Sequence, residues 1–260
     1  MCIRDRRRSL RLDDWCALGE RLAAAGKEVV LSSLALIEAE SELKALRRLC
    51  ANTSFLVEAN DMAAVQLLAG ETGFIAGPSV NIYNQHTLVT LARLGLKRWV
   101  MPVELSRDTL AEMQIHRPEG VETELFAYGR LPLALSARCF TARAHKLPKD
   151  DCQYRCLDYP DGMPLSTQED ARFLTLNGIQ TQSAQTYTLL AEMDDIRKLG
   201  VEVLRISPQS RHTPEIIQAF ADVIDARRDN TEAEAALTGY MPAGPCDGYW
   251  AGRPGLGWRS

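Results

Sequence analysis

Short apolar segments alternate with amphipathic helical segments along most of this chain, and this alternation is the strongest constraint on its fold. Strands that alternate with helices pair in parallel, because each helix carries the chain back to the start of the next strand. The sequence therefore predicts an α/β fold. The expected strands lie near residues 28–31, 55–58, 74–76, 98–101, 125–128, 172–176 and 201–206, and the expected helices near 12–25, 36–50, 61–68, 86–94, after 106, 183–199 and from 213 onward.

The first predicted helix has no strand before it, so the chain reads as an eight-fold βα barrel that lacks its first strand. A doubly wound open sheet is the alternative, since periodicity does not show whether a sheet closes. We expect residues 1–8 to form a disordered or non-native leader and residues 9–260 to form a single barrel-like domain. Within that domain we expect an insertion at 131–170 and an irregular tail, rich in Gly and Pro, at 231–260.

Composition and charge exclude several classes of function. The net charge is −4, whereas a nucleic-acid-binding surface is normally basic. No apolar run approaches the roughly 18–20 residues that a transmembrane helix needs. The arginines near the N-terminus are not followed by the apolar segment of a secretory signal. We therefore expect a protein without a transmembrane segment that resides in the cytoplasm.

Polar residues stand where the predicted strands end. In a βα barrel the active site forms at the C-terminal ends of the strands, although polar residues there also serve as plain helix caps. About half of them are expected to be structural. The set consists of Ser32, Ser33, Glu58, Asn60, Asn81, Asn84, Glu104, Ser106, Asn177, Gln180, Ser207 and Gln209.

The insertion carries Cys139, Cys152 and Cys156, with twelve residues between the first two and three between the last two. A long segment that interrupts the alternation of strands and helices more often has a function than not. Disulfides are unusual in the cytoplasm, and thiolates are the preferred ligands of soft metals and iron–sulfur clusters. The spacing of Cys152 and Cys156 places both thiols on one face if that stretch is helical. These three cysteines are therefore predicted to hold a metal centre.

The spacing alone leaves the metal open. Zinc is an alternative to an iron–sulfur cluster, because His145 could complete a Cys3His site. A further alternative is that the three thiols bind no metal. Cys2 and Cys246 lie in irregular segments, so either could supply a fourth ligand.

Several stretches resemble the U32 peptidase family, within which the chain is most similar to the ubiquinone-biosynthesis (UbiV-like) branch. The resemblance extends over nearly the whole chain from Arg7. The matching stretches are Leu31-Ser-Ser-Leu-Ala-Leu36, Trp99-Val-Met-Pro-Val-Glu-Leu-Ser-Arg107, Leu131-Pro-Leu-Ala-Leu-Ser-Ala-Arg-Cys-Phe-Thr-Ala-Arg143, Pro148-Lys-Asp-Asp-Cys152, Leu176-Asn-Gly-Ile-Gln-Thr181 and Cys246-Asp-Gly-Tyr-Trp250.

The resemblance implies a barrel-like fold and a [4Fe–4S] cluster with Cys139, Cys152 and Cys156 as three of its ligands. It also implies a heterodimer with a UbiU-like paralogue. The two proteins together would support oxygen-independent ring hydroxylation of a polyprenylated quinone precursor. The family pattern places the fourth cysteine where this chain has Arg4, and Cys2 stands two residues away. We therefore expect cluster binding to be weak or absent unless a native N-terminus is restored.

Two other functions remain as alternatives to the hydroxylase subunit. The family label suggests a peptidase, but the chain has neither a His-Glu-x-x-His zinc motif nor a Gly-x-Ser-x-Gly nucleophile motif. A non-catalytic protein stabilised by zinc is the other alternative, because structural metal sites can support a fold directly.

Overall fold

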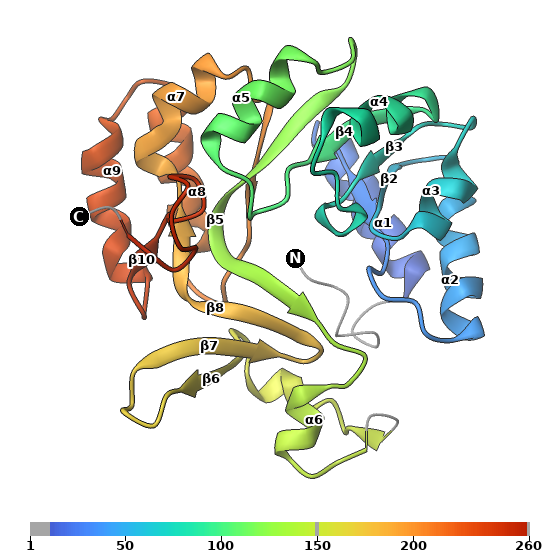
Figure 1. The fold of residues 1–260 in the computed structure, drawn as a ribbon. Coiled ribbons are helices and arrows are strands. Elements are labelled where there is room, and N and C mark those ends of the chain that lie inside the picture. The colour runs from blue at the N-terminus through green and yellow to red at the C-terminus, as the bar shows by residue number, and fades with distance from the viewer. Residues whose placement is uncertain (1–10, 149–150, 259–260) are drawn as a thin grey trace. The chain divides into compact units, whose positions relative to one another are not determined.

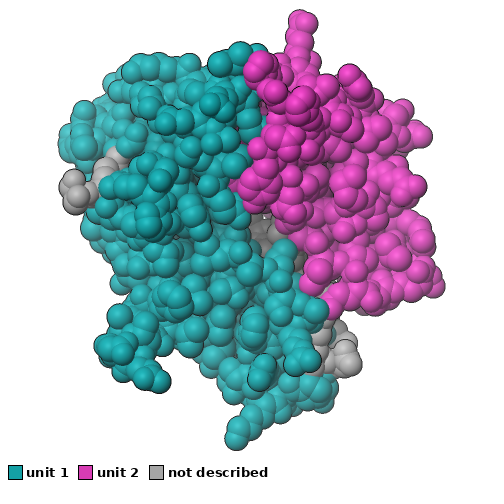
Figure 2. Space-filling model, in the orientation of Figure 1, with its two compact units in different colours: residues 1, 103–115, 124–260 teal, residues 2–102, 116–123 magenta. Residues whose placement is uncertain are grey.

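The computed structural model describes residues 11–148 and 151–258, and these residues group into two compact units. Unit 1 contains residues 103–115 and 124–258, and unit 2 contains residues 11–102 and 116–123 (Figure 2). The predicted leader at residues 1–8 lies outside the described residues. In the part of the chain that is described, no helix is both long enough and apolar enough to span a membrane.

Unit 2 is a run of strands and helices in which each strand pairs in parallel with the next, in the order β1-β2-β3-β4. Helix α3 packs against β2 and β3, and α4 packs against β4 (Figure 1). The elements are α1 (Leu12–Ala24), β1 (Val30–Ser32), α2 (Glu40–Cys50), β2 (Leu56–Ala59), α3 (Met62–Leu68), β3 (Phe74–Ala76), the 3-10 helix η2 (Pro78–Val80), α4 (Gln85–Arg93) and β4 (Leu96–Val100).

Local signals explain these elements. Gly26 has φ +75°, a left-handed conformation that favours glycine, and it follows Ala25, the C-cap residue of α1. Asp61 accepts a hydrogen bond from the Ala63 amide and so caps the first turn of α3. Strand β3 is apolar at all three positions and fully buried, as expected for a parallel strand covered on both faces.

Unit 1 combines parallel and antiparallel pairing. Strand β5 pairs in parallel with β9 but antiparallel with β8, and β8 continues into an antiparallel ladder with β7 and then β6. Strand β10 pairs in parallel with β8. The elements are α5 (Arg107–Ile115), β5 (Glu122–Leu135, whose first two residues belong to unit 2), α6 (Phe140–Ala144), η4 (Arg155–Asp158), β6 (Met163–Ser166), β7 (Arg172–Asn177), β8 (Gln180–Thr188), η5 (Leu190–Glu192), α7 (Met193–Lys198), β9 (Val203–Ile206), α8 (Thr213–Ile224), α9 (Asn230–Leu237), η6 (Thr238–Tyr240) and β10 (Pro245–Cys246).

Two sequence predictions fail in unit 1. The segment 172–177 is a strand as expected, but it lies in an antiparallel hairpin with β8 and is not a parallel barrel strand. The predicted helix at 183–199 is wrong in its first half, because residues 180–188 form β8 and only Met193–Lys198 is α-helical. Thr181, Thr186 and Thr188 are β-branched and favour extended backbone, and pairing with β5 and β7 outweighs the weak helical period.

The mixed α/β class is confirmed, and closure into an eight-fold barrel stays a prediction. Strand β5 runs to Leu135, so the first residues of the predicted 131–170 insertion extend a strand and do not form a loop. The C-terminal tail is also more regular than expected at its start, because Asn230–Leu237 is helix α9 with Asp229 as its N-cap.

Candidate functional site

Cys139 lies at the start of helix α6, and this helix is anchored to the turn between β7 and β8. The Phe140 amide donates to the Gly178 carbonyl at 2.9 Å, and the Thr141 hydroxyl accepts from the Gly178 amide at 3.1 Å. Cys139 is the N-cap residue, and its Sγ accepts a hydrogen bond from the Ala142 amide at 3.4 Å. The thiolate is the form of cysteine that binds metal.

Cys152 and Cys156 follow in a tightly folded segment. Gln153 and Tyr154 both have positive φ, at 51° and 53°, and the short 3-10 helix η4 begins only after them. The two cysteines therefore do not share one helical face, because Gln153 and Tyr154 between them are not helical. Cys156 is buried, whereas Cys152 is half-buried.

Helix α6 and η4 pack against each other, so Cys139 and Cys156 belong to neighbouring elements of one small substructure. His145, the alternative zinc ligand, lies at the C-terminal end of α6, where its Nε2 is 3.1 Å from the hydroxyl of Tyr159. The two rings also touch, with centroids 5.7 Å apart. This contact joins the end of α6 to the residue that follows η4.

The predicted ligands have the chemistry that soft metals and iron–sulfur clusters prefer. Within residues 11–148 and 151–258, no three Cys, His, Asp or Glu side chains are grouped in a way that could hold a metal ion. Cys2, the candidate fourth ligand, lies outside the described residues. The assignment of Cys139, Cys152 and Cys156 as metal ligands therefore stays a prediction.

Cys246 lies in a different part of unit 1. It sits in β10, paired with Tyr187 of β8, and both residues are buried. Burial, together with the neighbouring charge of Asp247, raises the pKa of the Cys246 thiol to about 12. A thiol with this pKa stays protonated at neutral pH, so Cys246 has the properties of a buried apolar residue.

Four of the polar strand-end residues form one buried network in unit 2. The Ser32 hydroxyl donates to Glu58 Oε1 at 3.1 Å, and the Asn60 side-chain amide donates to the same oxygen at 2.8 Å. The Asn60 backbone amide donates to the Ser33 hydroxyl at 2.9 Å. Glu58 is 5% exposed and Asn60 1%. The sequence correctly placed these residues at strand ends, but it could not show that they bond to each other.

A glycine completes this network. A Cβ added at Gly77 would lie 2.1 Å from Asn60 Oδ1 and 2.9 Å from Glu58 Oε1, so only glycine fits beside the two side chains. The buried Glu58 carboxylate is thus held in one orientation at the C-terminal ends of β1 and β2. Ligands of parallel α/β sheets commonly bind at this edge.

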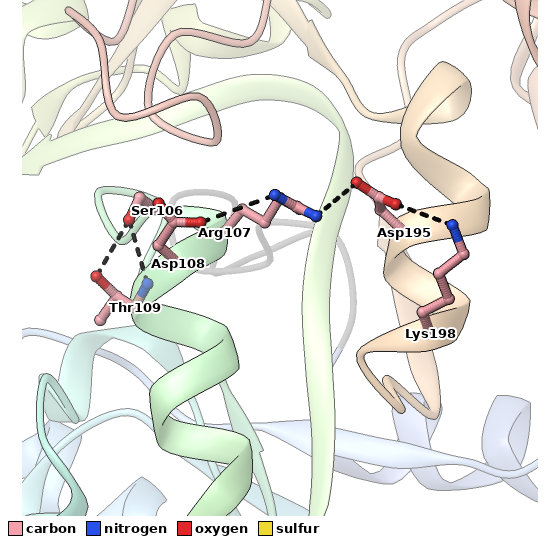
Figure 3. Close-up of polar contacts among 6 residues, drawn as sticks. All are labelled: Ser106, Arg107, Asp108, Thr109, Asp195 and Lys198. Atoms are coloured by element: carbon pink, nitrogen blue, oxygen red, sulfur yellow. Dashed lines mark hydrogen bonds and ion pairs between the residues drawn. The ribbon is translucent and has the colours of Figure 1, made fainter.

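Other strand-end residues are helix caps. Ser106 precedes α5, and its hydroxyl accepts from the Thr109 amide at 3.3 Å and contacts the Thr109 hydroxyl at 3.1 Å (Figure 3). Arg107 then joins α5 to α7 through a 3.0 Å ion pair with Asp195, which also contacts Lys198 (Figure 3). Asn84 caps α4 in the same way. For Ser106 and Asn84 the structural interpretation is the better one.

A second charged group in unit 2 lies near the opposite, N-terminal ends of the strands. Arg98 of β4 donates from Nε to Glu122 at 2.7 Å and from a terminal nitrogen to both carboxylate oxygens of Glu28, at 3.0 and 3.1 Å. Burial alone would lower the pKa of Arg98, but the hydrogen bonds and charges of Glu122 and Glu28 outweigh it and raise the pKa. The three side chains line an open groove together with Lys97 and Gly120. Groups at this end of a βα unit usually serve stability.

The sequence model of the peptidase family U32 matches residues 1–259. The chain belongs to this family. The match agrees with the resemblance seen in the cysteine-bearing stretch and in the Cys246–Trp250 motif, and it extends over both units of the structure. No solved structure matches the chain.

Proposed function

We propose that this U32 family protein is an iron–sulfur subunit that supports oxygen-independent ring hydroxylation in ubiquinone biosynthesis. The feature that carries the proposal is the segment 131–156, which contains all three of the proposed cluster ligands and whose residues resemble the UbiV-like branch of the family. Family membership is consistent with this proposal but does not distinguish it from other U32 functions.

Local structure supports a cluster in this segment in two ways. Cys139 and Cys156 belong to α6 and η4, which pack together, so the two cysteines lie in one small substructure. Arg138, Arg143 and Arg155 surround the cysteines in the sequence, and positive charge offsets the negative charge of a thiolate-bound cluster. When bound, such a cluster would supply one-electron chemistry or a Lewis-acidic iron.

The partner in this proposal is a UbiU-like paralogue, and the substrate is a polyprenylated quinone precursor with an aromatic head group. The fourth ligand is proposed to be Cys2. Zinc bound by the same cysteines is the alternative, and it would make the site structural.

The test is anaerobic reconstitution of the chain with iron and sulfide, followed by metal analysis and visible spectroscopy. We expect close to four irons per chain and a broad sulfur-to-iron absorption band, both lost in Cys152→Ala and Cys156→Ala. Cys50→Ala is the matched control, because Cys50 ends α2 in unit 2 and should not affect the band. A colourless protein that holds stoichiometric zinc would refute the iron–sulfur assignment.

A second measurement tests the pathway separately from the cluster. Anaerobic ubiquinone synthesis in cells that depend on this chain should stop when Cys152 or Cys156 is replaced. Continued synthesis in those cells would refute the hydroxylase role even if the cluster were present. Cleavage of peptides by the purified chain would instead support the peptidase interpretation of the family label.

A further inference from the structure

The turn between β7 and β8 contains Asn177-Gly178, the single Asn-Gly pair in the sequence. In such a pair the glycine nitrogen can attack the side-chain amide carbon of the asparagine, because glycine has no side chain to hinder the approach. Asn177 pairs with Gln180 across a two-residue turn, and Gly178 has φ +64°, as in a type II′ turn. Asn177 is half-buried and Gly178 is buried. This labile pair therefore lies in a turn that the fold holds in one conformation.

The reaction of an Asn-Gly pair needs no partner except water. The Gly178 nitrogen forms a bond to Cγ of Asn177, the Cγ–Nδ2 bond breaks, and ammonia leaves with the proton of the Gly178 amide. Water then opens the cyclic imide. Opening at the side-chain carbonyl gives aspartate, whereas opening at the main-chain carbonyl gives isoaspartate, in which the main chain runs through the former side chain.

Two features of the folded chain oppose this reaction. Asn177 is the last residue of β7, and its extended backbone keeps Cγ and the Gly178 nitrogen apart. The Gly178 amide also donates to the hydroxyl of Thr141 at 3.1 Å. The attacking species is the deprotonated amide nitrogen, and a hydrogen bond that the N–H donates stabilises the protonated form. The Thr141 hydroxyl therefore protects the pair.

Helix α6 supplies this protection as part of its own anchoring. The Phe140 amide donates to the Gly178 carbonyl at 2.9 Å, so the start of α6 holds both main-chain groups of this glycine. Thr141 is 1% exposed. Just before the helix, the Ser136 amide donates to the Ile179 carbonyl at 2.9 Å. The turn therefore stays closed as long as the start of α6 is docked on it.

We propose that Asn177 is a site of spontaneous isoaspartate formation that Thr141 suppresses while helix α6 is docked. Opening of α6 frees the turn, and the reaction then converts a transient opening into a permanent change. An isoaspartate at this position adds a carbon atom to the main chain, breaks the pairing with Gln180 and displaces the Gly178 groups that hold α6. Cys139 immediately precedes α6, so the modification loosens this cysteine as well. The proposal does not depend on the iron–sulfur assignment, because no step involves a metal.

The experiment incubates the full chain in mildly alkaline buffer, both in its native state and unfolded in guanidinium chloride. Mass spectrometry of separated peptides, together with enzymatic methylation of isoaspartyl carboxyl groups, measures isoaspartate at position 177. We expect the native wild-type chain to form it about tenfold more slowly than the unfolded chain, or slower still, because the turn must first open.

Replacement of Thr141 tests the protecting bond directly. Thr141→Val removes the hydroxyl but keeps the branched shape, and it should speed the native reaction about two- to tenfold, the factor expected for the loss of one buried hydrogen bond. Thr141→Ser keeps a hydroxyl and should stay close to the wild-type rate. Thr175→Val is the matched control, because Thr175 is buried in the same hairpin but does not accept from the Gly178 amide. If the valine variant does not fold, Thr141→Ala lacks the hydroxyl too and gives the same comparison.

The Asp247-Gly248 pair is an internal reference within every sample. Its Gly248 amide donates to the main-chain carbonyl of Gly257 at 3.0 Å, and this bond remains when Thr141 is replaced. A faster reaction at Asn177 alone supports the proposal. The proposal is overturned if native and unfolded wild-type chains react at the same rate at Asn177, or if the folded variant without the hydroxyl reacts no faster than the wild-type chain. An equal increase at both pairs also overturns it, since that result indicates general unfolding and not release of this turn.

Discussion

Gly248 lies where two stretches of main chain touch, and Gly248→Ala tests how tightly the C-terminal loop is packed. An added Cβ would lie 1.8 Å from the carbonyl oxygen of Pro254 and 3.1 Å from the amide nitrogen of Gly257. Real Cβ contacts do not fall below 3.0 Å, so the loop must open by more than an ångström. The colliding atoms belong to the backbone, so a rotamer change cannot relieve the clash.

The magnitude follows from what the opening would disrupt. Forcing an extra methyl group into packed structure costs about 1–3 kcal/mol. The Gly257 carbonyl accepts from the Asp247 amide at 2.9 Å and the Gly248 amide at 3.0 Å. Losing each of these bonds adds about 0.5–1.5 kcal/mol. Alanine recovers only about 0.4–1 kcal/mol by restricting the unfolded chain, so we expect a net loss of roughly 2–4 kcal/mol.

The assay is urea unfolding followed by tryptophan fluorescence, because Trp250 is 3% exposed and lies in the same loop. Gly239→Ala is the control, since a Cβ at that position would meet no atom within 4 Å and the backbone is not left-handed. The control should unfold within about 0.5 kcal/mol of the wild-type chain or be slightly more stable. If Gly248→Ala matches this control, the steric reasoning is wrong.

Three further predictions concern buried polar groups. Arg98→Met should lower the free energy of unfolding by about 1–3 kcal/mol in urea titrations. The loss is modest because the half-exposed carboxylates of Glu28 and Glu122 become hydrated again when the arginine is removed. An unchanged free energy of unfolding would contradict this prediction. Tyr128→Phe should be neutral or stabilise the chain by up to about 1 kcal/mol, because the buried Tyr128 hydroxyl has no hydrogen-bond partner in the described residues. A clear loss of stability in the same urea titrations would refute this prediction. Cys246 should resist iodoacetamide at pH 8 in the native chain, because its pKa is raised to about 12 and only about one thiol in ten thousand is then ionised. Mass spectrometry would measure the labelling, and equal labelling of native and urea-unfolded chains would contradict this prediction.

The sequence by itself determined the elements whose signals are local. The strands near 55–58 and 74–76 and the helices near 61–68 and from 213 onward lie within a residue or two of their predicted positions. A buried parallel strand is a short apolar run, and a helix start is set by its own cap residue, so neither needs knowledge of distant partners. The same locality explains why three cysteines in one 131–156 segment could be recognised together.

Tertiary structure decided whatever depends on partners far away in the chain. Residues 180–188 became a strand because β5 and β7 lie on either side of them, although their own sequence pattern also fits a helix. Glu58 is held in place partly by Ser32, which belongs to a different strand and donates to the Glu58 carboxylate. Asp161 is tied to Ser210, 49 positions further along the chain, by hydrogen bonds from the Ser210 amide and hydroxyl. Hydrogen bonds of this kind are set by the folded positions of both groups, and sequence patterns carry information on only one of them at a time.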